Sequence, residues 1–147
     1  MLLFASSDMW HAQAGANAWA ERDETDPVFR VLQTGMIVIY ARPFSTSNFV
    51  RLERDDYRPN ESGLADLHDL LIDMRDRAAA HTDEPKRSGR TAGIGFGEGP
   101  SGNPIVGIAE EYEIISRSSL PDLLKLFESQ KVSFELESEK IRKELRT

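Results

Sequence analysis

The sequence of 147 residues contains no cysteine. Without thiols the chain can form neither disulfides nor thiolate metal sites, and it has no cysteine nucleophile. Disulfides are the usual stabilising device of small secreted domains. The reducing cytoplasm is therefore the expected setting.

Long hydrophobic runs are also missing. After the apolar start Met1–Phe4, the longest apolar stretch is Met36–Ala41, far short of the roughly 20 residues that span a bilayer. No Lys or Arg precedes Arg22, whereas a signal peptide begins with a cationic segment. We expect neither a membrane span nor a secretion signal.

Basic residues are outnumbered, with 18 Lys and Arg against 25 Asp and Glu and a formal net charge of -7. This balance argues against capture of long nucleic acid by the whole surface but leaves room for a local basic site. Apolar residues make up 39% of the chain and charged residues 29%, which is ordinary for a folded protein. The length predicts one domain, residues 1–147.

The spacing of apolar residues, together with residues that begin or end helices, predicts a mainly α fold, a four-helix bundle. Asp26 is a predicted N-cap with Pro27 at the first helical position, and Ser119 with Asp122 resembles a capping box. Pro85 ends the third helix, whose stripe Leu64, Leu67, Leu71, Met74, Ala78 and His81 is the clearest in the chain. The predicted helices cover residues 8–21, 26–41, 64 to about 81, and about 27 residues from Ser119.

Two further segments complete the predicted fold. Residues 43–60 are a long connection, and Ile94–Phe96 with Ile105–Ile108 form a short β-hairpin ahead of the long C-terminal helix. That helix would be about 40 Å long at 1.5 Å per residue, more than a small bundle needs. Its end is expected to pack on a partner chain.

One group of residues could act in catalysis. Arg75, Asp76, Arg77 and His81 stand close together at the end of the third helix. A neutral imidazole can take a proton from a ribose 2′-hydroxyl or return one to the leaving oxygen. A guanidinium can hold the phosphate as charge develops, and no metal or other cofactor is required.

These residues resemble a known family. An Arg, a polar residue and, after four to six intervening residues, a His at the end of a bundle helix are similar to the motif of the HEPN superfamily. Here Arg75, Asp76 and His81 supply it with five intervening residues. The resemblance implies a dimeric four-helix bundle and a metal-independent ribonuclease of toxin–antitoxin or defence systems. In that family the Arg and His of two protomers meet in a cleft.

Helix geometry limits what one chain can do alone. Six residues turn a helix by about 600°, so Arg75 and His81 point about 120° apart and are separated by about 9 Å along the axis. Arg77 lies only about 40° from His81 and is its better neighbour within the helix. Bringing Arg75 and His81 together therefore requires a frayed helix end or a second protomer.

We therefore expect a homodimer in which His81 acts as general base or acid, Arg75 stabilises the phosphorane and Asp76 orients them. Arg77 and His68 would bind the substrate, which is RNA, and the implied partner protein is an antitoxin. A structural reading stays open: His81 is then a core histidine, and the arginines pair with Asp69, Asp73 and Asp76 on a solvated face.

The alternative function is a non-catalytic dimerisation or protein-interaction module. It presents the hairpin and the terminal helix to a partner, and it makes Arg75 and His81 dispensable. In this alternative, replacing an apolar residue by a charged one, as in Phe134→Asp, disrupts assembly.

Overall fold

The computed structural model describes the chain except for residues 1, 46–51, 84–92, 99–103, 110–114 and 147, and it describes side chains outside residues 78–114. Where the sequence predicts one domain, contacts divide the chain into two compact units. The first comprises Met1–Arg77 with Ile115–Thr147, and the second is Ala78–Ile114, which interrupts the first along the chain.

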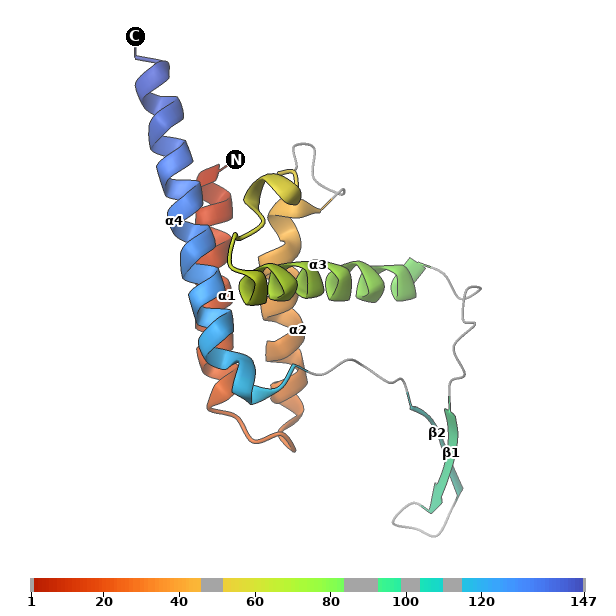
Figure 1. Cartoon of the computed structure of the whole chain (residues 1–147). Coiled ribbons are helices and arrows are strands. Elements are labelled where there is room, and N and C mark those ends of the chain that lie inside the picture. The colour runs from red at the N-terminus through yellow and green to blue at the C-terminus, as the bar shows by residue number, and fades with distance from the viewer. Residues whose placement is uncertain (1, 46–51, 84–92, 99–103, 110–114, 147) are drawn as a thin grey trace. The chain divides into compact units, whose positions relative to one another are not determined.

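The prediction of a mainly α protein is confirmed. Among the described residues lie the α-helices α1 (Leu2–Ala20), α2 (Pro27–Ala41), α3 (Ser62–Asp83) and α4 (Leu120–Glu144). Single turns of 3-10 helix are η1 (Arg42–Phe44), η2 (Asp55–Tyr57) and η3 (Arg117–Ser119). In the first unit α1 lies beside α2 and α4, and α3 runs across them to complete the helical bundle (Figure 1).

Small side chains bring α1 close to its neighbours. Ala5, Ala12 and Ala16 are buried on the helix, and a Cβ atom placed on Gly15 would lie 3.3 Å from the Cβ of Met36 in α2. Gly15 is therefore explained by this close approach, although glycine in a helix interior costs up to about 1 kcal/mol relative to alanine. An alanine there would require Met36 to give way by a few tenths of an ångström.

The pairing of α1 with α4 is antiparallel. Ser6 Oγ donates a hydrogen bond to Glu135 (2.9 Å), and Gln13 Nε2 donates one to Glu128 (2.9 Å). Residue numbers thus rise along α1 as they fall along α4. Since Ser6 in the second turn of α1 already lies opposite Glu135, the last turns of α4 run beyond the start of α1 (Figure 1).

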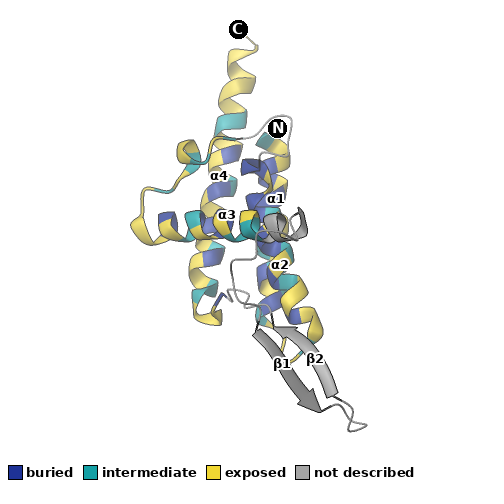
Figure 2. Cartoon of the chain, turned by 90° about the vertical axis from the view of Figure 1, so that its right-hand side faces the viewer, coloured by how far each residue is buried: buried dark blue, intermediate teal, exposed yellow. Residues whose placement is uncertain are grey.

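Aromatic rings fill the centre of the first unit. The ring of Tyr40 lies 5.1 Å from that of Phe127, and the ring of Phe134 lies 5.0 Å from that of Tyr57 and 6.2 Å from that of Phe44. These distances suit tilted and edge-on aromatic pairs. Figure 2 shows the buried residues gathered where the helices face one another, while the last turns of α4 are exposed.

The observed helix starts can be compared with the capping residues that the sequence predicts. Asp26 is confirmed as the N-cap of α2, with its carboxylate accepting from the backbone N–H of Val28 at 2.8 Å. The predicted capping box is wrong, because Ser119 makes no side-chain cap and Ser116 instead accepts from Ser118 N. α1 also begins earlier than the predicted residue 8, since Asp8 lies inside the helix and is buried.

The second unit contains strands β1 (Gly93–Glu98) and β2 (Pro104–Ala109). They are antiparallel, with Ile94 opposite Ile108 and Phe96 opposite Val106. The connecting residues 99–103 of the expected hairpin lie outside the described residues.

Candidate functional site

The third helix places His68 and Arg75 on the face that meets the core. Leu64, His68, Leu71 and Arg75 follow one another at spacings of four, three and four residues, which keeps them on one side of α3. Leu64, His68 and Leu71 are buried, and the side chain of Arg75 is only 20% exposed. Of the predicted site residues, His68 and Arg75 are therefore on the inner side of the helix, whereas the side chain of Asp76 is exposed.

His68 is held by a buried hydrogen-bond chain. Its Nδ1 atom lies 2.6 Å from the hydroxyl of Tyr40, and its Nε2 atom lies 3.3 Å from the carbonyl oxygen of Arg54. Since a carbonyl only accepts, Nε2 carries the proton and Nδ1 accepts from Tyr40. Both nitrogen atoms of a neutral imidazole are thereby satisfied.

Burial sets the charge of this pair. Desolvation lowers the pKa of His68 and raises the pKa of Tyr40 well above its ordinary value, and the negative charge of Asp69 adds to the rise for Tyr40. His68 has no exposed surface, so it is a core residue. This buried position does not support the predicted role of His68 in substrate binding.

Three aspartates on one flank of α3 meet arginines from the preceding segment. Arg54 bonds Asp69 through Nε and Asp73 through Nη1, each at 2.9 Å, and Arg58 bonds the other oxygen of Asp69 at 2.9 Å. Arg58 also lies 3.7 Å from Asp66. This network, which we call the α3 clamp, fixes the segment that contains η2 to the helix.

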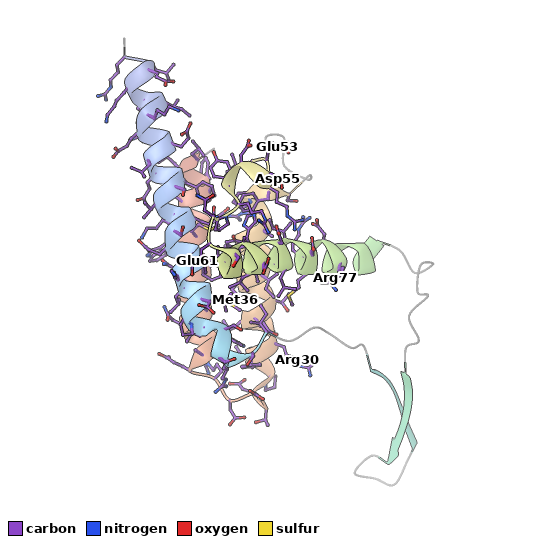
Figure 3. All side chains as sticks on the ribbon, viewed as in Figure 1. Arg30, Met36, Glu53, Asp55, Glu61 and Arg77 are labelled. Atoms are coloured by element: carbon purple, nitrogen blue, oxygen red, sulfur yellow. The ribbon has the colours of Figure 1, made fainter. Side chains whose placement is uncertain are left out.

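Asp69 is the centre of the α3 clamp. Burial favours its protonated form, but the hydrogen bonds from Arg58 and Arg54 outweigh burial, so the pKa of Asp69 lies below its ordinary value. At the start of the helix, Lys125 of α4 pairs with Glu61 at 2.7 Å. Figure 3 shows Glu61 at this end of α3 and Arg77 far along the helix.

The predicted catalytic residues are brought together in part. Arg75 Nη1 donates to Asp76 Oδ1 at 2.9 Å, and Arg77 Nε donates to the backbone carbonyl of Asp73 at 3.3 Å. His81 belongs to α3, but its side chain lies outside the described residues. The pairing of Arg75 with Asp76 is the contact expected both of an orienting carboxylate and of a structural ion pair.

Two important polar residues were not expected from the sequence. Asp8 of α1 is buried and accepts from Arg42 Nε at 2.9 Å, with a second contact from Arg42 Nη2. Tyr40, the partner of His68, is fully buried. The spacing of apolar residues could have indicated that Asp8 and His68 are buried. Asp8 falls between Ala5 and Ala12 at helical intervals, and His68 falls between Leu64 and Leu71 in the same way.

A separate surface lies at the far end of α4. Ile141 and Leu145 follow Phe134 after seven and eleven residues, so all three lie on one side of the helix. Phe134 is buried, whereas Ile141 is 40% and Leu145 is 82% exposed. The buried stripe of α4 thus continues past the part of the first unit that covers it.

Within the described residues, no group of three or more His, Asp or Glu side chains could hold a metal ion. None of the described helices combines the length and hydropathy of a membrane span. The chain matches no family model, no curated protein and no solved structure. The function is therefore inferred from the geometry of α3 and α4.

Proposed function

We propose that the chain is a non-catalytic helical module that works by forming a homodimer. The end of α4 carries this proposal, because Ile141 and Leu145 repeat the spacing of the core stripe but lie outside the core. Apolar side chains at this spacing suit the packing of one helix against another. A second chain that covered them would extend the buried stripe.

The charges around α3 support a structural reading of that helix. The guanidinium groups of Arg54, Arg58 and Arg75 already bond carboxylates of the same chain. An RNA phosphate would have to displace these carboxylates, and the net charge of -7 opposes its approach. These three arginines therefore fit stabilisation of the fold better than capture of a phosphate.

Sedimentation equilibrium of the whole chain tests the proposal. We expect the average mass to rise with concentration towards twice the chain mass of 16.5 kDa. A mass that stayed at one chain up to the solubility limit would contradict the homodimer. Circular dichroism of the same samples shows whether the protein is folded.

A second candidate function is a HEPN-like, metal-independent endoribonuclease of a toxin or defence system, acting in the cytoplasm. It is favoured by one contact, the 2.9 Å bond from Arg75 to Asp76, because the family resemblance gives Asp76 the role of orienting carboxylate. His81 would then transfer the proton and Arg75 would stabilise the phosphorane. The products would carry a cyclic phosphate, and an antitoxin would be the natural inhibitor.

RNA cleavage in the presence of EDTA separates the two candidates. The ribonuclease predicts cyclic-phosphate ends, loss of cleavage in His81→Ala and strong loss in Arg75→Lys, which keeps the charge but not the guanidinium geometry. His11→Ala is the matched control, because His11 is an exposed histidine on α1. The non-catalytic module predicts no cleavage by any of these proteins.

A further inference from the structure

The last turns of α4 carry an ordered row of charges beside the exposed apolar residues. Glu135, Glu139, Arg142 and Arg146 follow one another at spacings of four, three and four residues, so they share one flank of the helix. All four are exposed. The row has two acids followed by two bases, and we call it the α4 charge row.

Within the described residues, no ion pair engages Glu139, Arg142 or Arg146. Glu135 accepts a hydrogen bond from Ser6 and still remains exposed. On the other flank of the same turns, Glu137 lies 3.9 Å from Lys140 of its own chain. The charge row is therefore open to a partner on the flank where its signs are segregated.

We propose that the occupant of this surface is a second copy of the chain, with the two α4 ends paired antiparallel. A two-fold axis between residues 140 and 141 turns Ile141 and Leu145 of each helix towards the other copy, and the charge row then runs along one border of the contact. This axis places Glu135 opposite Arg146 of the second copy and Glu139 opposite Arg142. Both contacts occur twice, so the row is complementary to itself.

The direction of pairing follows from the order of the charges. A parallel pair would set each acid beside the same acid and each base beside the same base, which is unfavourable. In the antiparallel pair, Ile141 lies close to its own symmetry mate and Leu145 lies near the helix turn that begins at Glu137. The apolar stripe and the charge row thus favour the same centre.

This inference rests on the proposed homodimer and adds its surface and direction. Two variants test it in sedimentation experiments on the full chain. Glu135→Arg with Glu139→Arg makes the row entirely basic, and Arg142→Glu with Arg146→Glu makes it entirely acidic. Alone, each variant should dimerise at least about tenfold more weakly than wild type, because like charges face each other.

An equimolar mixture of the two variants should restore association, because an entirely basic row matches an entirely acidic one at both contacts. Leu136→Asp is the control, since Leu136 is 62% exposed but lies on the opposite side of the helix from Ile141. It should dimerise like wild type, and circular dichroism should show equal helicity for every variant.

The possible failures are distinguishable. If wild type dimerises but the charge variants dimerise equally well, or if their mixture stays monomeric, the α4 surface is wrong while the homodimer stands. If wild type is monomeric at every concentration, the proposed function itself fails.

Discussion

The hydroxyl of Tyr40 in α2 lies 2.6 Å from Nδ1 of His68 in α3, and both side chains are fully buried. This bond joins two helices that cross, and the Nε2 contact with the Arg54 carbonyl extends it to the segment before α3. A buried polar pair of this kind stabilises one particular arrangement of its elements only if both partners are present.

Tyr40→Phe should lower the free energy of unfolding by about 1–3 kcal/mol, because it leaves Nδ1 of His68 buried without a donor. Urea denaturation measures the change. Tyr57→Phe is the control, since among the described residues Tyr57 makes its contacts through its ring and backbone. Equal stability losses in the two variants would mean that the Tyr40–His68 bond contributes nothing specific.

Acidification should weaken the fold through His68. Its folded pKa is lowered by burial, so below the unfolded value of about 6.5 the unfolded chain takes up this proton before the folded chain does. The free energy of unfolding is then unaffected by His68 above that pH and falls as the pH drops below it, by at most about 1.4 kcal/mol per unit. His68→Gln should flatten the slope measured between pH 5 and 7, and an unchanged slope would contradict this account.

Arg42→Met should destabilise the chain by about 1–3 kcal/mol, because it leaves the carboxylate of Asp8 buried without its guanidinium. The loss is at the modest end for a charged pair, since the Arg42 side chain is 57% exposed and screened by water. Adding Asp8→Asn to Arg42→Met should recover part of the stability in thermal denaturation. If the double variant is no more stable than the single one, the buried carboxylate is not the cause.

Phe134 and Ile141 should behave differently although they share one side of α4. Phe134→Ala should cost about 3–5 kcal/mol, because the ring is fully buried against Tyr57 and Phe44. Phe134→Asp should therefore unfold the protein, so that loss of assembly in this variant would follow from loss of the fold. Ile141→Asp should leave the folded monomer nearly unchanged and weaken the dimer, as helicity and sedimentation measured on the same samples can show.

Local signals predicted most of the helices. The N-cap at Asp26, Pro27 and the apolar stripes sufficed for α2, α3 and α4, because capping and periodicity depend on residues close together in the sequence. The sequence did not place Asp8 inside α1. A charged residue in a sequence indicates a helix start or a surface position, unless its partner is known. The partner of Asp8 is Arg42, which is far away in the sequence.

The candidate site shows the same limit. The apolar residues alone define the predicted buried stripe of α3. The side that meets the core in the structure also includes the polar residues His68 and Arg75. Only contacts with Tyr40 and Asp76 show why polar side chains can occupy that side. Similarly, the arginines of the α3 clamp come from the connection 43–60, whose course could not be predicted from short-range patterns.

The most direct test of the account is a pair of distances measured by electron spin resonance across the dimer. Because the chain has no cysteine, Ser129→Cys and Lys140→Cys each introduce one labelling site on an exposed position of α4. Antiparallel pairing centred near residue 140 predicts a short distance between labels at 140 and about 35 Å between labels at 129, at 1.5 Å per residue. Equal distances at the two positions would mean parallel pairing, and the absence of any dipolar signal at both would contradict the dimer.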